Sequence, residues 1–376
     1  MKTTSSEHEK YMRIALDLAI RGAGKVSPNP MVGAVIVKDD KIIGQGYHSA
    51  YGEPHAEIEA LKRCPNSAGA TLYVTLEPCC HYGKTPPCTD FIIKRKIAKV
   101  VVGSKDPNPL VFGKGIKILK ENGIEVEKDV LKKECREVNE IFFHYMQKRK
   151  PFVVMKYAMT ADGKIATSSG ESKWITGNSA REHTHRTRNA LSGIMVGIGT
   201  VLSDDPLLTC RMPGGKNPVR IICDTTLKIP LDSKIVQTAK KVPTIIAASS
   251  SNVFFDSSKK EQLENLGITI LKTELKDSKL DLQDLMKKLG KLGIDSIFLE
   301  GGGTLNYSAL QQGIVQKIHI YMGAKIFGGQ DSLSPVAGAG IKNISEAVNL
   351  KLSKVTEIGG DVLIEYRVKE VKCSQA

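Results

Sequence analysis

The sequence predicts an α/β protein made of two different domains in succession. The chain has 376 residues, which is too long for one typical domain. In both halves, helical segments alternate with short apolar segments of strand character, an order typical of sheets covered by helices. The pattern restarts at Pro151, directly after the basic run Lys148-Arg149-Lys150, and no segment repeats. We therefore expect one domain over residues 1–148 and a second over residues 151–376.

In the first domain, helices and strands alternate at short intervals. Apolar residues at helical spacing, among them Met12, Leu16 and Ile20, predict a helix near the start. Two apolar segments that turn at Asp39-Asp40 predict a β-hairpin over residues 32–47. The remaining expected elements are helices over residues 55–61, 88–94 and 116–121, strands over 71–75 and 100–103, and one long helix from about 130 to 147.

The second domain begins with a buried strand over residues 152–157. Further short apolar segments predict strands, and helix-like segments separate them. A stretch rich in Gly, Ser and Ala over residues 330–350 predicts a loop before a final pair of strands. The expected strands lie at residues 194–197, 219–223, 244–248, 297–300, 317–321, 354–358 and 362–367.

The composition is that of an ordinary globular protein. Hydrophobic residues make up 41% of the chain, and no apolar segment approaches the roughly 20 residues of a membrane-spanning helix. The net charge of +14 is evenly divided, because residues 1–150 hold 25 basic and 18 acidic side chains and the remainder holds 29 and 22. With 5% aromatic residues, such diffuse charge indicates a solvated surface. We therefore expect neither a membrane nor a nucleic acid as a partner, whereas anionic small molecules fit this charge well.

The start of the chain and its cysteines indicate a cellular location. Residues 1–10 are polar and charged, so no signal peptide is expected. The chain has eight cysteines, and those outside the motif described next show no spacing of a disulfide framework. We therefore expect reduced thiols and a cytoplasmic protein.

One motif of the first domain indicates a metal centre. His55-Ala56-Glu57 is followed by Glu77-Pro78-Cys79 and by Cys88, which offer one imidazole and two thiolates. Zinc prefers such ligands, and with three of them it keeps a fourth position for water, whose pKa falls to about 7. A carboxylate that is not a ligand, here Glu57, can then carry protons to a leaving amine. The pattern therefore favours a zinc-dependent hydrolytic deaminase.

Two other functions are compatible with parts of this motif. Cys80 or His81 could supply a fourth ligand, which would make the zinc purely structural in a binding protein. A deaminase acting on bases of tRNA or single-stranded DNA is the second alternative. Such enzymes usually space their cysteines C-x-x-C, whereas eight residues separate Cys79 from Cys88 here.

The second domain holds two glycine-rich turns at predicted strand ends. Glu300-Gly301-Gly302-Gly303-Thr304-Leu305 follows one strand, and Gly197-x-Gly199-Thr200 follows another. Glycines at such positions let a pyrophosphate approach backbone N–H groups. A glycine turn by itself is often only a turn, but two in one sheet favour a nucleotide site at its strand ends.

At this point the sequence resembles the bifunctional riboflavin-biosynthesis deaminase–reductase family over nearly the whole chain. In the first domain the resemblance rests on Pro28-Asn29-Pro30-x-Val32-Gly33, Gly46-Tyr47-His48, His55-Ala56-Glu57, the long loop from Cys79 to Cys88 and Asp106-Pro107-Asn108-Pro109. In the second it rests on Lys156-x-Ala158-Met159-Thr160-x-Asp162-Gly163-Lys164, Ser172-x-Trp174-Ile175-Thr176-Gly177, the segment from Gly197 to Arg211, and Glu300-Gly301-Gly302.

The resemblance implies a cytidine-deaminase-like α/β/α sandwich for the first domain. One Zn²⁺ would be held by His55, Cys79 and Cys88, with Glu57 as the proton shuttle. The substrate would be 2,5-diamino-6-ribosylamino-4(3H)-pyrimidinone 5-phosphate, which loses the amine at ring position 2. Cys80 departs from the small residue usual in the family. The implied substrate-binding residues are Asn29, His48, His81, Lys84, Asp106 and Asn108.

For the second domain the resemblance implies a dihydrofolate-reductase-like α/β fold that uses NADPH. Hydride would pass to the ribose C1 and give 5-amino-6-ribitylaminouracil 5-phosphate, with Lys156 near the reacting sugar. The residue that holds the 2′-phosphate of NADPH is open, and residues 225–226 are one suggestion. We also expect a homo-oligomer, a dimer or a tetramer. The implied NADPH contacts are Ala158, Trp174, Thr200, Asp204, Gly302, Gly303, Thr304, Leu305, Asn306, Tyr307 and Ser308, and the implied substrate contacts are Ser172, Arg188, Leu208, Arg211 and Glu300.

Overall fold

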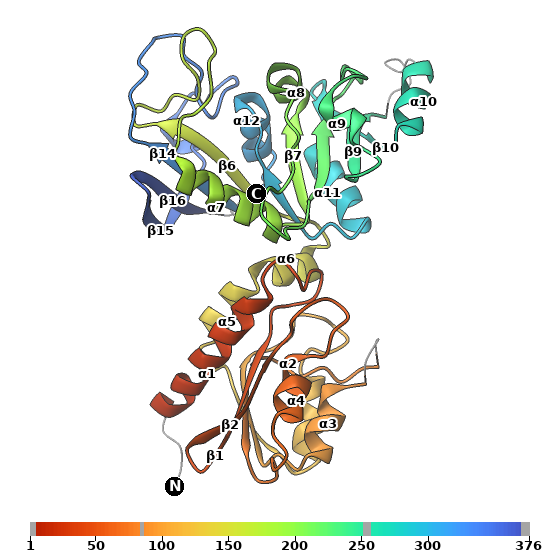
Figure 1. Ribbon diagram of the computed structural model, residues 1–376, viewed down its shortest axis with the longest axis vertical. Coiled ribbons are helices and arrows are strands. Elements are labelled where there is room, and N and C mark those ends of the chain that lie inside the picture. The colour runs from red at the N-terminus through yellow and green to blue at the C-terminus, as the bar shows by residue number, and fades with distance from the viewer. Residues whose placement is uncertain (1–4, 83–85, 251–256, 370–376) are drawn as a thin grey trace. The chain divides into compact units, whose positions relative to one another are not determined.

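The chain divides into two compact units, residues 1–149 and residues 150–376. The structure is a computed structural model that describes residues 5–82, 86–250 and 257–369 (Figure 1). The clusters of core side chains within these ranges each lie inside one unit. The two units are therefore described separately.

The first unit is built on a sheet of five described strands in the order β2-β1-β3-β4-β5. β2, β1 and β3 pair antiparallel, whereas β3, β4 and β5 pair parallel. The strands are β1 Gly33–Lys38, β2 Lys41–Tyr47, β3 Thr71–Leu76, β4 Lys99–Ser104 and β5 Glu125–Lys128. The helices are α1 Ser5–Ala19, a 3₁₀ turn Ile20–Gly22, α2 Ala56–Lys62, α3 Cys88–Lys94, α4 Lys114–Glu121, α5 Lys132–Val138 and α6 Glu140–Lys148.

Alternating side chains of the strands belong to two separate hydrophobic cores. In β1, Ala34 and Ile36 join the cluster formed with α2, α3 and α4, whereas Val35 and Val37 join the cluster formed with α1 and α5. This follows from the two-residue period of a strand, which points successive side chains to opposite faces. Helices therefore cover both faces of the sheet, as Figure 1 shows with α1 and α5 on one side and α2, α3 and α4 on the other.

Two strand glycines allow helices to lie very close to the sheet. A Cβ atom at Gly33 would lie 1.9 Å from the carbonyl oxygen of Ala15 in α1, and one at Gly46 would lie 2.4 Å from the backbone nitrogen of Ala60 in α2. Such distances are far below van der Waals contact, so larger residues would push the helices away. The close approach of α2 fixes its N-terminus, which immediately follows His55.

The sequence predicted most elements of this unit, with two differences. The single long helix over residues 130–147 is wrong, because α5 ends at Val138 and α6 starts at Glu140. Asn139 lies between them, and its side chain accepts a hydrogen bond from the backbone nitrogen of Met31 and donates one to the carbonyl of Met31, each at 2.8 Å. β5 was not predicted, because Glu-Val-Glu-Lys is a polar edge strand without a buried apolar run.

The second unit has a sheet of nine strands within the described ranges, in the order β10-β9-β8-β7-β13-β6-β14-β16-β15. The strands from β10 to β14 pair parallel, and β16 and β15 add antiparallel. They are β6 Phe152–Thr160, β7 Gly193–Gly197, β8 Val219–Cys223, β9 Thr244–Ser249, β10 Ile268–Thr273, β13 Ser296–Leu299, β14 Lys317–Gly323, β15 Leu350–Ile358 and β16 Asp361–Val368.

Helices again cover both faces of this sheet. Neighbouring residues of one strand, such as Ile194 and Met195, belong to the two different core clusters on its two faces. A small hairpin of β11 Leu275–Lys276 and β12 Lys279–Leu280 lies outside the main sheet. The helices are α7 Asn178–Ala190, α8 Ile198–Asp204, α9 Lys234–Gln237, α10 Ser257–Asn265, α11 Leu282–Lys291 and α12 Gly303–Gln311, with a 3₁₀ turn at Ile344–Glu346.

All strands that were predicted for this unit are present, including the final pair, now β15 and β16. β10 and the β11–β12 hairpin were missed. β10 is a half-exposed strand at the edge of the sheet, and each hairpin strand has only two residues.

No helix in the described part of the chain is long and apolar enough to cross a membrane.

Candidate active sites

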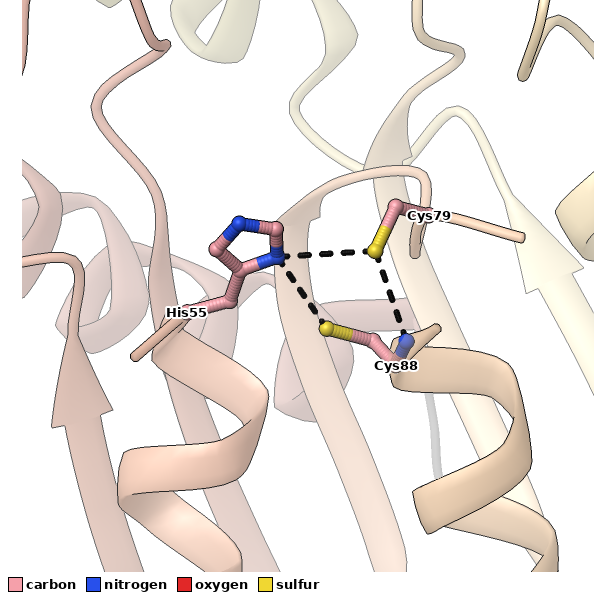
Figure 2. A group of neighbouring side chains, drawn as sticks. All are labelled: His55, Cys79 and Cys88. Carbon is pink, nitrogen blue, oxygen red and sulfur yellow. Dashed lines mark hydrogen bonds between the residues drawn. The ribbon is translucent and has the colours of Figure 1, made fainter. Parts of the chain in front are cut away.

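Three side chains from separate segments meet in the first unit (Figure 2). His55 immediately precedes α2, Cys79 follows β3, and Cys88 is the first residue of α3. The Nδ1 atom of His55 lies 3.4 Å from the Sγ atom of Cys79 and 3.3 Å from that of Cys88. Their potential ligand atoms all lie within 4.8 Å of one another. The predicted metal-binding residues are therefore brought together.

The surroundings of Cys79 favour its thiolate. Hydrogen bonds from the Cys88 side chain and from His55 lower the pKa of the Cys79 thiol to about 4. The backbone nitrogen of Cys88, at the start of α3, adds a hydrogen bond to the same sulfur at 3.3 Å. The thiolate is the form that binds a metal ion, so this sulfur is prepared as a ligand.

The group contains no fourth protein ligand among the described residues. Cys80 turns away, and its thiol lies 3.8 Å from the carbonyl oxygen of Leu110. His81 lines the neighbouring cavity, and its buried Nδ1 atom has no hydrogen-bond partner within the described ranges. Three ligands with an open position are typical of catalytic zinc, whereas structural zinc normally has four protein ligands.

Glu57 is a buried acid two residues after His55. It lies in the first turn of α2, and its side chain is 3% exposed. Burial raises the pKa of the Glu57 carboxyl to about 6, although the charge of His55 acts in the opposite direction. A carboxyl group with a pKa near neutrality can both accept and return a proton.

A cavity of about 260 Å³ adjoins the group and is lined by His55, Glu57 and Cys79. Within it, the Asn29 amide lies 3.1 Å from the His48 ring, and burial raises the pKa of the Asp106 carboxyl to about 7. Lys84 lies outside the described residues. The cavity thus gathers all the other substrate-binding residues predicted for this domain, which are Asn29, His48, His81, Asp106 and Asn108.

Other residues at this site were not predicted. Glu77, which was noted only as part of a motif, accepts hydrogen bonds from the backbone nitrogens of Asp106, Gly113 and Ile116. Phe142 and Met146 of α6 line the cavity, although they are distant in sequence from every motif. Only tertiary packing places them there, so no local pattern could have indicated them.

The second unit contains a larger cavity of about 790 Å³ at the carboxyl ends of β7, β8 and β13. Both predicted glycine turns line it, through Gly197 to Thr200 and through Gly302 to Leu305. A Cβ atom at Gly302 would point toward the Thr200 hydroxyl at 3.7 Å. The cavity gathers the predicted residues Ser172, Thr200, Asp204, Gly302, Gly303, Thr304, Leu305 and Ser308.

A charged cluster lies directly before the second glycine turn. Arg188 donates two hydrogen bonds to Glu300, from Nε at 2.6 Å and from Nη2 at 3.1 Å, and the Nζ atom of Lys156 lies 3.5 Å from the same carboxylate. Burial alone would raise the pKa of Glu300, but the charges of Arg188 and Lys156 hold it at about 2. His185, which was not predicted, lies near these charges, and burial together with the positive charges lowers its pKa.

The remaining predicted residues do not belong to the described lining of the 790 Å³ cavity. The Trp174 side chain is 58% exposed and lies 4.3 Å from the Arg181 guanidinium. Asn306 and Tyr307 bind the carbonyls of Pro335 and Gly340, so they hold a neighbouring loop. Ala158 lies in β6, Leu208 is buried, and the backbone nitrogen of Arg211 donates to His185.

The two units thus combine a candidate zinc centre with a candidate nucleotide site, which defines a two-domain deaminase and reductase. Comparisons agree with this division. Residues 5–104 match the cytidine and deoxycytidylate deaminase zinc-binding region, and residues 151–364 match the RibD C-terminal domain.

Full-length relatives match almost end to end. The riboflavin biosynthesis protein RibD of Actinobacillus pleuropneumoniae is 53% identical over 95% of this chain and 94% of its own length. RibD of Escherichia coli K12 is 37% identical over 95% of this chain and 98% of its own length. The chain therefore belongs to the RibD family.

Solved structures show the same two-domain architecture. The diaminohydroxyphosphoribosylaminopyrimidine deaminase/5-amino-6-(5-phosphoribosylamino)uracil reductase of Thermotoga maritima is 36% identical, with a TM-score of 0.84 over 97% of this chain and 99% of its own. Acinetobacter baumannii RibD is 35% identical, with a TM-score of 0.86 over 98% of this chain and 100% of its own. The predicted fold classes are confirmed.

The predicted function and cofactors are also confirmed at the level of the two activities. The protein is a bifunctional enzyme of riboflavin biosynthesis that acts on a small molecule. Its N-terminal domain is a zinc-dependent deaminase, and its C-terminal domain is an NADPH-dependent reductase.

Proposed function

We propose that His55, Cys79 and Cys88 hold the zinc ion of the deaminase and that Glu57 transfers protons beside it. The observation that carries the proposal is that these three ligand atoms meet beside a cavity that is lined by His55, Cys79 and the buried Glu57. The donor set fits zinc, since one imidazole and two thiolates are ligands that it prefers. When bound, zinc supplies a hydroxide at neutral pH by lowering the pKa of water to about 7.

In this proposal Glu57 accepts a proton from the attacking water and returns it to the pyrimidine. The amine at ring position 2 leaves as ammonia, and the oxygen of water takes its place. Glu57 suits this role because it lines the cavity, is buried and is not one of the three grouped ligands. Asn29, His48, His81, Asp106 and Asn108 position the ring and ribose, and Lys84 contacts the phosphate.

We propose that the 790 Å³ cavity receives NADPH, with its pyrophosphate at the two glycine turns. α12 starts at Gly303, so its free backbone N–H groups lie at one of these turns. The cofactor would contact Ala158, Trp174, Thr200, Asp204 and the segment from Gly302 to Ser308. When bound, NADPH would supply the hydride that reduces the ribose C1 and opens the sugar ring to a ribityl chain.

Lys156 and Glu300 lie where β6 and β13 run side by side, and we assign Lys156 to donate a proton to the sugar oxygen released on ring opening. Ser172 and Leu208 complete the substrate contacts. The Nε and Nη2 atoms of Arg188 donate hydrogen bonds to Glu300, and its Nη1 atom donates one to the carbonyl of Thr209. The side chain of Arg211 is exposed, so Arg211 is the better candidate for the ribose 5-phosphate.

The test of this division is a comparison of the two half-reactions in one purified variant. Glu57→Ala is expected to abolish ammonia release from the diaminopyrimidinone ribotide, because no carboxylate remains to move the proton. The same variant should still oxidise NADPH when it is given the deaminated ribotide. Zinc content by atomic absorption provides the control for an intact centre. Loss of both activities in a folded, zinc-loaded variant would show that the roles are assigned wrongly.

We further propose that the protein is a homo-oligomer, a dimer or a tetramer, and that it is located in the cytoplasm. We assign the deaminase domain to residues 1–148 and the reductase domain to residues 151–376. Several large apolar side chains of the second unit are exposed, including Ile326 at 77% and Ile344 at 91%, which supports burial against another copy. Free cysteines support a reducing compartment. A monomeric mass in light scattering would refute the oligomer.

A further inference from the structure

Two side chains of different kinds approach the ammonium group of Lys156 on β6. The carboxylate of Glu300, directly after β13, lies 3.5 Å from Nζ, and the centre of the Tyr321 ring on β14 lies 5.7 Å from it. A cation within about 6 Å of an aromatic face is attracted by the negative potential of the ring. β13 and β14 flank β6 in the sheet, so the ammonium group is held from both sides. The Lys156 side chain is 17% exposed and stays within reach of a ligand.

The register of the strands explains why Tyr321 lies at this place. β14 pairs parallel with β6, with His319 opposite Lys156 and Tyr321 opposite Ala158. Residues two positions apart on a strand point to the same face, so Lys156, Ala158 and Tyr321 share one face of the sheet. Ala158 also packs against the small core cluster that contains Tyr321. The ring therefore adjoins the proposed proton donor and a proposed cofactor contact.

The Tyr321 side chain is itself fixed from α7. It is 1% exposed, and its hydroxyl lies 2.7 Å from Nδ1 of His183. Burial raises the pKa of Tyr321 to about 12 and lowers the pKa of His183, so both groups are uncharged at neutral pH. The hydrogen bond thus anchors the ring to the helix and adds no further charge beside Lys156.

α7 holds the partners of Lys156 on both of its sides. Arg188 of α7 donates two hydrogen bonds to Glu300, at 2.6 and 3.1 Å, while His183 of the same helix contacts Tyr321. Five residues rise about 7.5 Å along a helix, and two strand spacings of about 4.8 Å separate β13 from β14. These lengths are similar, so one helix can fix both the carboxylate and the ring.

We propose that Tyr321 is a positioning residue of the reductase: its buried ring holds the Lys156 ammonium group beside the reacting sugar, and His183 holds the ring. This role rests on the proposed function of Lys156. In that function Lys156 gives one proton to the sugar ring oxygen, while the bond between this oxygen and C1 breaks and C1 receives the hydride. A donor that is already oriented lowers the entropic part of the barrier.

The experiment measures reduction of the deaminated ribotide by the full-length, zinc-loaded protein. Tyr321→Leu is expected to lower kcat about tenfold, because the attraction between ring and ammonium group is lost. The KM of the ribotide and the Kd of NADPH should stay within about twofold, since the ring orients a reacting group and does not bind either ligand. Tyr366→Leu is the matched control. Tyr366 lies on β16 and packs against the core on the opposite face of the same sheet, so its loss should leave kcat unchanged.

Double substitutions separate positioning from a loss of stability. In a Lys156→Met background, Tyr321→Leu should change the single-turnover rate by less than about twofold, because the ring acts through the ammonium group. A purely structural role would lower the rate equally in both backgrounds. Tyr321→Phe keeps the ring and loses its anchor, so kcat should fall about threefold. His183→Ala removes the same hydrogen bond, and the combined variant should be no slower than either one alone.

The possible outcomes distinguish this inference from the function on which it rests. An unchanged kcat in Tyr321→Leu, or a loss of the same size without Lys156, would overturn the role of Tyr321 alone. Wild-type reduction by Lys156→Met would instead refute the proposed proton donor. If circular dichroism shows that Tyr321→Leu does not fold, Tyr321→Phe and His183→Ala decide the question, and full activity in both contradicts the proposal.

Discussion

Glu77 shows how one side chain can anchor the loop that carries a proposed metal ligand. It lies two residues before Cys79, and its carboxylate accepts backbone hydrogen bonds from Gly113 at 3.0 Å, Ile116 at 3.2 Å and Asp106 at 3.3 Å. Two of these donors lie at the start of α4, where backbone N–H groups lack partners within the helix. A negative charge there also interacts favourably with the helix dipole. Glu77 thus ties the loop that carries Cys79 to α4 and to the loop that carries Asp106.

We expect Glu77→Ala to lower the free energy of unfolding of the deaminase domain by about 3 kcal/mol, because two buried donors and one half-buried donor lose a charged acceptor. Zinc affinity should fall as well, since the loop that carries Cys79 loses its anchor. Urea denaturation and competition with a chromogenic chelator measure the two effects. Glu121→Ala at the exposed end of α4 is the control. A stability within about 0.5 kcal/mol of wild type would contradict this role for Glu77.

The candidate metal site was predictable because its residues lie in short motifs whose spacing reflects local geometry. His55 and Glu57 flank the start of a helix, and Cys79 follows a strand. The roles of Glu77 and Phe142 were not predictable. Glu77 accepts hydrogen bonds from backbone groups 29 to 39 residues away, and Phe142 lies far in sequence from the motif residues that line the same cavity. The engagement of Arg188 by Glu300 likewise joins residues 112 positions apart. Sequence spacing shows which chemistry is present, whereas packing decides which groups remain free.

At the scale of elements, the spacing of apolar residues predicted the helices and strands in which that spacing is regular. Strands with buried apolar runs were found, and the polar edge strand β5 and the half-exposed β10 were not. The break between α5 and α6 at Asn139 was not predicted either. Its cause is a pair of side-chain hydrogen bonds to Met31, 108 residues away, which no local pattern records.

The packing of α1 against the sheet includes a buried polar cluster. The His8 side chain lies under the helix, with Nδ1 2.9 Å from the Tyr73 hydroxyl of β3 and Nε2 3.3 Å from the ammonium group of Lys99 in β4. Glu127 of β5 lies 3.1 Å from Nε2, and Glu7 and Glu125 also act on the ring. Burial, reinforced by Lys99, outweighs these acids and lowers the pKa of His8. The cluster therefore joins α1 to three strands with a neutral imidazole.

This cluster predicts that the stability of the deaminase domain depends on pH. His8 has its pKa lowered on folding, so below about pH 6.5 the unfolded chain takes up a proton that the folded domain resists. The free energy of unfolding should therefore be at its full value above pH 6.5 and fall as the pH drops. Urea denaturation between about pH 5 and pH 8 measures this slope.

His8→Gln provides the comparison, because glutamine keeps polar contacts but does not titrate. The slope between about pH 5 and pH 6.5 should be smaller in the variant than in the wild type. Equal slopes would show that other groups govern the acid sensitivity.

At the scale of the whole molecule, the two activities belong to units with separate cores. The described clusters of core side chains fall on one side or the other of residues 149 and 150. The candidate zinc ligands lie in residues 55–88, whereas the cavity proposed for NADPH lies in residues 165–337. Relatives match both units across 94–98% of this chain, so the two units occur together in them. Loss of one site should therefore leave the chemistry of the other intact.

Removal of zinc tests this independence directly. Dialysis against a strong chelator should abolish ammonia release, because the hydroxide is no longer supplied, while NADPH oxidation with the deaminated ribotide stays within about twofold of the untreated rate. The chelated protein should also show a lowered melting transition for the deaminase domain only, since an ion that binds the folded domain stabilises it by mass action. Readdition of Zn²⁺ should restore both properties, whereas Mg²⁺, which prefers oxygen ligands, should restore neither. Ammonia release that persists in metal-free protein would refute the zinc mechanism, and parallel loss of reduction would show that the two units are coupled.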